Sequence, residues 1–316
     1  MIVVLGVLLA ILCIIILFGI YQKKTNALCE SKKRIDGKTV LVTGGTAGMG
    51  LEIARELATR GARVIVACPF PEEGIAAREH IVHTTGNNNV QFKHLDLASL
   101  ASTRRFADEV LRNENRLDIL VNNAGVAGPC ERNTADGMNI VMQVNYFGTF
   151  LLTLLLLPLL KKTGMPGERS RIVNTASVLH RLGKVSDDLN ANYKVLRGEV
   201  YARSKLCVVL FTRELAQRLK GENVVVNSVD PGAVGTGIFQ SWNETVGRIV
   251  RWITYCFFKT PWEGAQTALH VALDEGAGDV TGEFFRNCRL SSASQTACDA
   301  ELAKTLWKES EKLVKM

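Results

Sequence analysis

Apolar residues follow two different patterns along this 316-residue chain. The first is an unbroken run of apolar or small residues from Ile2 to Ile20. The second begins at Gly37, where short runs rich in β-branched residues alternate with longer segments of helical period. This alternation predicts βαβ units, and therefore an α/β domain built on a doubly wound parallel sheet of about seven strands. The expected strands are 39–42, 63–66, 90–92, 117–121, 171–173, 224–226 and 282–285, and the expected helices are 51–60, 72–82, 103–111, 141–160 and 201–219, with a closing helix through Leu302, Leu306 and Leu313.

The first apolar run would span roughly 30 Å as a helix, so we predict a membrane anchor over residues 1–20. A cleaved secretory signal is the alternative. However, no Lys or Arg precedes the run, the run is longer than a typical signal core, and no small-residue cleavage site follows it. Residues 21–36 form a basic linker that contains Lys23, Lys24, Lys32, Lys33 and Arg34. Positive charge beside a span favours the cytosolic side, so we predict a single-pass protein whose catalytic domain faces the cytosol.

A second apolar run, from Phe150 to Leu160, raises the question of a second membrane span. The run is too short to cross a bilayer as a helix, and Pro158 stands near its end. We therefore predict a helix that is buried against the sheet.

Composition excludes several other classes of protein. The part after the anchor suits one large domain, which we place at 37–316. The net charge of +7 owes much to the basic linker, so an anionic membrane surface explains it better than nucleic acid does, and no nucleic-acid module is evident. The eight cysteines form no C-x-x-C pair. His80 and His83 share a helix face without a third ligand nearby, so we predict no metal site.

A glycine-rich segment directly follows the first expected strand and opens the first expected helix. It comprises Thr43, Gly44, Gly45, Thr46, Ala47, Gly48, Met49 and Gly50. Glycines allow a tight turn, and they let a pyrophosphate approach the N–H groups and the positive end of a helix. The strand before and the helix after are the context that a dinucleotide-binding turn requires, so we predict that these residues contact a cofactor in a Rossmann-type fold.

A tyrosine and a lysine four positions apart are the candidate catalytic pair. Tyr201 and Lys205 fall on one face of an expected helix, so the ammonium would stand beside the phenol. A nearby cation lowers the pKa of a phenol from about 10 towards the working pH, as a general acid or base needs. Ser177 ends the fifth expected strand, where its hydroxyl can donate to a substrate carbonyl. Tyr255 and Lys259 have the same spacing without a strand-end serine before them, so we assign this second pair to substrate or membrane contact.

Taken in order, these motifs resemble those of the short-chain dehydrogenase/reductase family. Matches to its patterns are Thr43, Gly44, Gly48 and Gly50; Asp96; Asn122, Asn123, Ala124 and Gly125; Pro231, Gly232 and Thr236; and Asn145. The resemblance implies that the first four groups, with Tyr201 and Lys205, bind a nicotinamide cofactor, and that Asp96 contacts its adenine. It also implies that Ser177 polarises the carbonyl, Tyr201 transfers the proton, and Lys205 lowers the Tyr201 pKa while holding the ribose. Asn145 would complete a proton relay to Lys205 through water.

The choice between NADP and NAD depends on the end of the second strand. An acidic residue there would hold a ribose 2′-hydroxyl and a basic residue a 2′-phosphate. The chain has Ala67, Cys68 and Pro69 at this place, with no acid and no base, and Ala47 in the glycine turn is not basic either. The missing acid favours NADP, and NAD stays open.

Within this family, the chain resembles the membrane-anchored retinol dehydrogenase group. The likeness is in the anchor and linker, in 210–216, in 263–267 and in the insertion between Ser177 and Tyr201. It implies an endoplasmic reticulum membrane protein that interconverts retinol and retinal, with a steroid or fatty-aldehyde reductase as the alternative and a homodimer as a further expectation. An aromatic segment at 237–262 would cover a lipophilic substrate, although ordinary core packing explains it equally well. A membrane-tethered scaffold that keeps the fold without turnover is the non-enzyme alternative.

Overall fold

The computed structural model describes residues 2–127, 133–185, 189, 198–235 and 258–316. The strands are β1 (Thr39–Thr43), β2 (Arg63–Cys68), β3 (Val90–His94), β4 (Ile119–Asn122), β5 (Ser170–Thr175), β6 (Val224–Asp230), β7 (Phe284–Arg286) and β8 (Arg289–Ser291). The α-helices are α1 (Ile2–Lys24), α2 (Gly48–Thr59), α3 (Pro71–Thr85), α4 (Leu100–Asn113), α5 (Ile140–Met142), α6 (Gly148–Thr163), α7 (Glu199–Arg218), α9 (Pro261–Leu273) and α10 (Ala300–Val314). Shorter helical segments are η1 (Gln143–Phe147), η2 (Val178–Leu182), η4 (Gly276–Gly278) and η5 (Thr296–Cys298).

The sheet has the order β3-β2-β1-β4-β5-β6-β7-β8, and only the β7–β8 pair is antiparallel. The strand order reverses between β1 and β4, which places the carboxyl ends of these two strands at the topological switch point. The predicted doubly wound sheet is confirmed, with one strand more than expected. The extra strand, β8, arises because the chain turns back at Asn287 and Cys288, whose φ angles are 52° and 55°. Three residues are too few to show an alternating pattern, so the sequence did not reveal β8.

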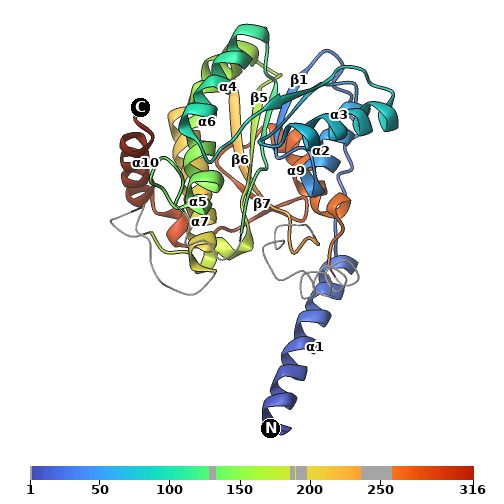
Figure 1. Cartoon of the computed structure of the whole chain (residues 1–316), viewed down its shortest axis with the longest axis vertical. Helices are drawn as coiled ribbons and strands as arrows, with labels where there is room; N and C mark the ends of the chain where they lie inside the picture. Colours follow the sequence, from blue (N-terminus) through green and yellow to red (C-terminus); the bar gives the residue numbers. More distant parts are fainter. Residues whose placement is uncertain (1, 128–132, 186–188, 190–197, 236–257) are drawn as a thin grey trace.

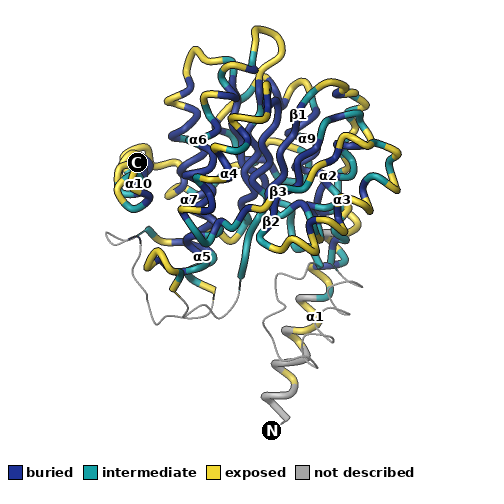
Figure 2. Tube along the Cα trace, turned by 45° about the horizontal axis from the view of Figure 1, so that its top comes forward, coloured by how far each residue is buried: buried dark blue, intermediate teal, exposed yellow. Residues whose placement is uncertain are grey.

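Helices cover both faces of the sheet (Figure 1), and each face has its own hydrophobic cluster. In β1, Val40 and Val42 pack with α2 and α9, whereas Leu41 between them packs with α4 and α6. The central strands β1, β2, β4, β5 and β6 are therefore buried on both sides, as Figure 2 shows in dark blue, which explains their largely apolar sequences.

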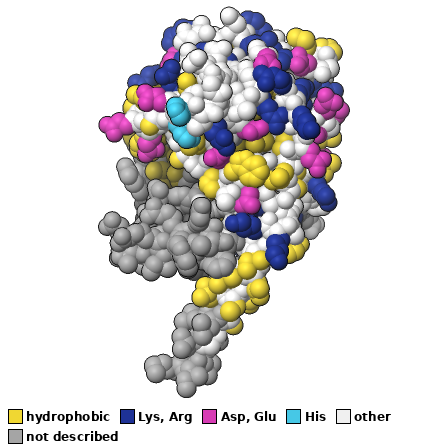
Figure 3. All heavy atoms as spheres, turned by 90° about the vertical axis from the view of Figure 1, so that its right-hand side faces the viewer, with side chains coloured by type: hydrophobic (Ala, Val, Ile, Leu, Met, Phe, Trp, Pro, Cys, Tyr) yellow, Lys and Arg dark blue, Asp and Glu magenta, His cyan; other side chains and the backbone are white. Residues whose placement is uncertain are grey.

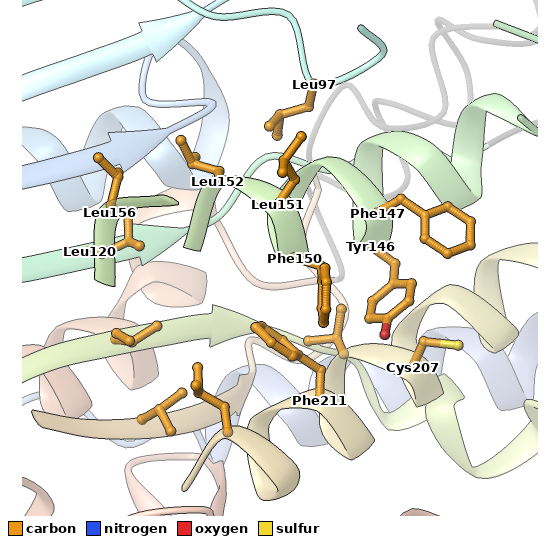
Figure 4. Close-up of a cluster of buried hydrophobic side chains, with 14 of the residues drawn as sticks. Leu97, Leu120, Tyr146, Phe147, Phe150, Leu151, Leu152, Leu156, Cys207 and Phe211 are labelled. Carbon is orange, nitrogen blue, oxygen red and sulfur yellow. The ribbon is translucent and has the colours of Figure 1, made fainter. Parts of the chain in front are cut away.

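An aromatic cluster joins the helices of one face (Figure 4). The ring of Phe150 on α6 lies 5.1 Å from the ring of Phe211 on α7 and 5.1 Å from that of Trp307 on α10, measured between centroids. Tyr146 on η1 completes the group at 6.0 Å from Phe150. Such tilted aromatic pairs stabilise a core beyond their buried area, so this cluster fixes α7, the helix that carries Tyr201.

The second apolar run forms α6, in the core. Among the described residues, Ile140–Thr163 is the one helical stretch long and apolar enough to span a membrane, and 72% of its most apolar window is buried. The interpretation as a buried helix is confirmed. The expected single helix differs in one respect, because η1 inserts one π-helical turn between α5 and α6.

Helix α1 projects away from the domain (Figures 1 and 3). It continues to Lys24, four residues beyond the predicted end of the anchor. Ile14, Leu17 and Tyr21 are 66%, 65% and 64% exposed, which is unusual for large apolar side chains clustered on one helix. The membrane anchor stays a prediction that this exposure supports.

Candidate active site

The glycine turn between β1 and α2 is built so that only glycine fits at its key positions. Gly44 and Gly48 have φ angles of +62° and +53°, in the left-handed region that glycine adopts freely. A Cβ atom added to Gly50 would lie 2.0 Å from the Gly44 carbonyl oxygen. The turn therefore packs directly on the first turn of α2.

The N-terminus of α2 is left without a side-chain cap. Its N-cap residue, Ala47, makes no side-chain hydrogen bond, and the first turn contains no acidic residue. The first N–H groups and the positive end of the helix dipole can therefore bind an anion such as a pyrophosphate. Together with the tight glycine turn before it, this helix N-terminus fits a dinucleotide cofactor.

The segment after β4 holds this turn in place through hydrogen bonds. Asn123 Nδ2 donates to the carbonyl oxygens of Thr43 (3.1 Å) and Gly44 (3.2 Å), and Thr43 Oγ1 accepts from the N–H groups of Asn123 (3.0 Å) and Ala124 (3.1 Å). Asn122 is 3% exposed, and its Nδ2 donates into the core. The side chains of Asn122 and Asn123 thus have internal partners, and the predicted cofactor contacts stay predictions.

The other predicted cofactor contacts line the same edge of the sheet. Asp96 follows β3, and its Oδ1 accepts from the Ala98 N–H (2.8 Å), which fixes the carboxylate. The Gly44 N–H donates to the Ala67 carbonyl (2.8 Å), so the end of β2 lies beside the glycine turn, as a ribose-binding position requires. Thr236 lies outside the described residues, as do residues 237–257 of the expected substrate-covering segment.

Tyr201 and Lys205 come together on α7 as their spacing predicts. Lys205 Nζ lies 5.6 Å from the centre of the Tyr201 ring and donates to the Thr175 carbonyl (2.8 Å). Ser177 stands two residues beyond Thr175, the last residue of β5, and is hydrogen-bonded to the Tyr201 phenol. The carboxyl end of β5 and the first turn of α7 thus bring the three candidate catalytic side chains together.

Asn145 reaches this group from the π-helical turn η1. Its Oδ1 accepts from the Val126 N–H (2.8 Å), and its Nδ2 donates to the Val126 carbonyl (3.0 Å) and to Ser204 Oγ (3.0 Å). A Cβ atom at Gly125 would lie 3.5 Å from both Asn145 Oδ1 and Lys205 Nζ, so Gly125 separates the two groups. Single π turns often occur at functional sites, where they redirect one side chain. The relay from Asn145 to Lys205 stays a prediction.

Burial dominates the ionisation of the candidate pair. It raises the pKa of Tyr201 to about 12, against the lowering effect of the hydrogen bond with Ser177. It lowers the pKa of Lys205 to about 8, against the raising effect of the Asp230 carboxylate. Desolvation of the phenolate therefore raises the Tyr201 pKa, contrary to the expected lowering by Lys205. Tyr201 is therefore protonated at neutral pH and can donate a proton.

Asp230 is a member of the site that the sequence reasoning missed. It ends β6 and is 1% exposed, with Oδ1 accepting from the Gly232 N–H (3.1 Å) and Oδ2 3.5 Å from Arg286 Nε. Its charge raises the pKa values of both Tyr201 and Lys205. A signal was present, because an acidic residue closes an otherwise apolar strand directly before Pro231.

His180 is a second missed residue. Its Nε2 accepts from the Ser294 N–H (3.0 Å), so its Nδ1 carries the proton and donates to the Ser177 carbonyl (2.7 Å). Burial lowers its pKa, which keeps the ring neutral. The imidazole thereby ties the peptide of Ser177 to a segment more than a hundred residues later in the chain.

Only one member of the second Tyr/Lys pair, Lys259, lies in the part of the chain that the structure describes. Tyr255 lies outside the described residues. Lys259 is 4% exposed, and its Nζ donates to Asn287 Oδ1 (3.5 Å). The predicted substrate or membrane contact of Lys259 stays a prediction.

Comparison with known proteins agrees with this geometry. Residues 38–247 match the model of the family described as short chain dehydrogenase. The chain is 41% identical to retinol dehydrogenase 11 from Homo sapiens over 90% of this chain and 87% of that protein. It is 40% identical to retinol dehydrogenase 12 from Bos taurus over 97% and 96%, respectively. Among solved structures, an uncharacterised protein from Mycobacterium paratuberculosis superimposes with a TM-score of 0.72 at 30% identity, covering 92% of this chain and 98% of that one. The RhlG/NADP active-site complex from Pseudomonas aeruginosa superimposes with a TM-score of 0.65 at 27% identity, covering 85% and 98%.

Proposed function

The chain belongs to the short-chain dehydrogenase family, and from that premise we propose that it interconverts retinol and retinal. It is an NAD(P)-dependent oxidoreductase that resembles the retinol dehydrogenases. The observation that carries the proposal is the arrangement of the Tyr201 phenol, which is hydrogen-bonded to Ser177 and lies beside Lys205. This group lies at the carboxyl edge of the sheet, where the glycine turn leads into α2. The relatives named retinol dehydrogenase support a lipophilic substrate.

Each side chain has one task in this chemistry. A nicotinamide dinucleotide held at the glycine turn would supply the hydride for the carbonyl carbon. Tyr201 gives its phenolic proton to the carbonyl oxygen, and the pKa of about 12 keeps this proton in place until it is needed. The Ser177 hydroxyl donates to the same oxygen and orients it. The Lys205 ammonium stabilises the phenolate that remains.

We propose NADP as the cofactor because the end of β2 has no carboxylate to hold a ribose 2′-hydroxyl. NAD is the alternative. It is favoured by Glu72 and Glu73, which stand exposed in the first turn of α3 and would repel a 2′-phosphate near this strand end. Rates of NADPH and NADH oxidation with the same aldehyde distinguish the two.

The test is a substrate panel with the full chain in detergent, comprising all-trans-retinal, a steroid ketone and a fatty aldehyde with each cofactor. We expect retinal to give the highest kcat/KM. In Tyr201→Phe, turnover should fall by roughly 10²–10⁴-fold, because the proton donor is lost, while cofactor binding and Tm stay unchanged. A Tyr201→Phe protein equal to wild type would favour the non-catalytic scaffold, and a preference for the steroid or fatty aldehyde would replace the retinoid.

We also propose that α1 anchors the protein in the endoplasmic reticulum membrane with the domain on the cytosolic side. Exposed apolar side chains along α1 and the basic residues Lys23 and Lys24 in its last turn support this topology. Alkaline carbonate should leave the full chain in the membrane fraction, and deletion of residues 1–22 should release it. Release of the intact chain by carbonate would contradict the proposal.

A further inference from the structure

Residues 25–31, which we call the strap, bind the domain from their first residue onwards. The side-chain amide of Asn287 donates to the Thr25 carbonyl (2.6 Å) and accepts from the Ala27 N–H (2.9 Å). Since α1 ends at Lys24, no free residue separates the helix from this contact. A flexible segment of this length would let its ends wander on the order of 15 Å. The contact with Asn287 removes that freedom.

The rest of the strap is held along α9. The Cys29 N–H donates to Gln266 Oε1 (3.1 Å), and Ser31 Oγ donates to the Leu273 carbonyl (3.3 Å). Arg60 Nη1, at the end of α2, donates to the Ser31 carbonyl (2.8 Å). The region predicted as a linker at 21–36 is therefore the end of α1 followed by a docked segment.

Asn287 is placed for this contact by the turn between β7 and β8. Its φ of 52° is a conformation that asparagine tolerates better than most residues, which accounts for the residue type but not for where its amide points. The same Oδ1 accepts from Lys259 Nζ (3.5 Å). The backbone of Lys259 bonds to Ala233 and Gly235, just after Pro231 and Gly232 at the edge of the candidate site.

The residue before Asn287 reaches the site from the other side. Arg286 Nε lies 3.5 Å from Oδ2 of the buried Asp230, whose charge acts on Tyr201 and Lys205. Arg286 and Asn287 are neighbours in the chain. Through them the end of α1 is linked to Asp230 and, by way of Lys259, to the segment after Gly232. We call this carboxyl end of the sheet, where Tyr201 also lies, the catalytic edge.

We propose that Asn287 is a positioning residue that fixes the orientation of the catalytic edge relative to α1, so that a substrate dissolved in the bilayer can reach Tyr201. The inference rests on the proposed function. The physical reason is that a domain without the strap contact would sample many orientations relative to the membrane. Only the fraction of molecules whose catalytic edge faces the bilayer could bind a membrane-dissolved substrate, so the apparent affinity falls with that fraction. A substrate in water meets the site in any orientation.

The test uses Asn287→Gly in the full chain, reconstituted in phosphatidylcholine vesicles. Glycine keeps the left-handed backbone without strain and removes the amide. We expect faster tryptic cleavage between Lys24 and Lys33, because the strap is released. We expect kcat/KM for all-trans-retinal in the vesicles to fall about tenfold, the equivalent of one or two lost hydrogen bonds, while kcat/KM for water-soluble hexanal changes less than twofold.

Asn287→Asp is the comparison variant, because it keeps the acceptor for the Ala27 N–H, replaces the donor to the Thr25 carbonyl by a carboxylate oxygen, and adds a charge near Lys259 Nζ. Its retinal activity should lie between those of wild type and Asn287→Gly. Unchanged cleavage in Asn287→Gly would overturn the strap contact. An equal loss of kcat/KM with both substrates would overturn the orienting role, because it indicates general damage to the site. Faster cleavage without a selective loss for retinal would overturn the orienting role. A wild-type protein that is inactive with both aldehydes would refute the proposed function. It would leave the strap contact testable, because the cleavage assay does not depend on activity.

Discussion

Replacing Lys205 by methionine should make the protein inactive but more stable at neutral pH. Lys205 is 2% exposed, and burial lowers its pKa from the ordinary 10.5 to about 8. This difference of 2.5 corresponds to about 3 kcal/mol of unfolding free energy that the charged lysine costs at pH 7. Methionine fills similar space, yet it leaves the Thr175 carbonyl without its donor, a loss of about 1–2 kcal/mol. The net gain at pH 7 is about 1–2 kcal/mol.

The pH dependence separates this explanation from a simple packing effect. Between pH 8 and 10.5, the unfolded chain keeps a proton on Lys205 that the folded chain has released, so the wild-type stability rises with pH. The cost of Lys205 falls to about 1 kcal/mol at pH 10, below the cost of the lost hydrogen bond. Lys205→Met should therefore be more stable than wild type at pH 7 and equal to it or less stable at pH 10.

The assay is thermal unfolding of the full chain in detergent at pH 7, 8, 9 and 10. A gain of 1–2 kcal/mol corresponds to a rise in Tm of about 4 °C for a domain of this size. Lys220→Met, the same change on an exposed lysine two residues beyond the end of α7, serves as the control and should show a Tm difference that does not vary with pH. A Lys205→Met protein whose Tm difference is constant from pH 7 to 10, or negative at pH 7, would refute the reasoning.

Three further changes test other parts of the site. Gly50→Ala should lower the free energy of unfolding by about 1–3 kcal/mol and weaken cofactor binding, because the added Cβ would lie 2.0 Å from the Gly44 carbonyl oxygen. Gly198→Ala adds a Cβ in open space, and it should therefore match wild type in Tm and in cofactor titration. Asp230→Asn should lower the Lys205 pKa further and move the basic limb of the kcat/KM profile to lower pH, and an unshifted limb would contradict the role of this charge. Burial lowers the pKa of His180, so the folded protein loses stability as the pH drops below about 6.5, where the unfolded chain takes up the proton. His180→Phe should therefore flatten the plot of Tm against pH in this range. An unaltered slope would show that the imidazole does not cause the loss of stability.

Local patterns were sufficient to predict most of the framework. The alternation of β-branched runs and helical segments predicted the parallel sheet, because strand and helix periods are properties of neighbouring residues. The glycine turn could also be predicted from the sequence, because its backbone angles and its close approach to α2 exclude most residue types other than glycine. The meeting of Tyr201 and Lys205 required only that 199–218 be a helix.

Other features depend on contacts that no local pattern encodes. The π turn that carries Asn145 differs from an α-helix by one inserted residue and has no periodic signature. The missed roles of Asp230 and His180 depend on Arg286 and Ser294, which come close only after the sheet has formed.

The sequence by itself determined the fold class, the glycine turn and the spacing of the candidate catalytic pair, because covalent neighbours set periodicity and backbone freedom. Tertiary structure alone decided that Tyr201 keeps its proton, because the desolvation that raises its pKa comes from the surrounding fold. It also decided that residues 25–31 form a docked strap, since Asn287 lies more than 250 residues away along the chain. Burial and long-range hydrogen bonds exist only once distant segments have been brought together.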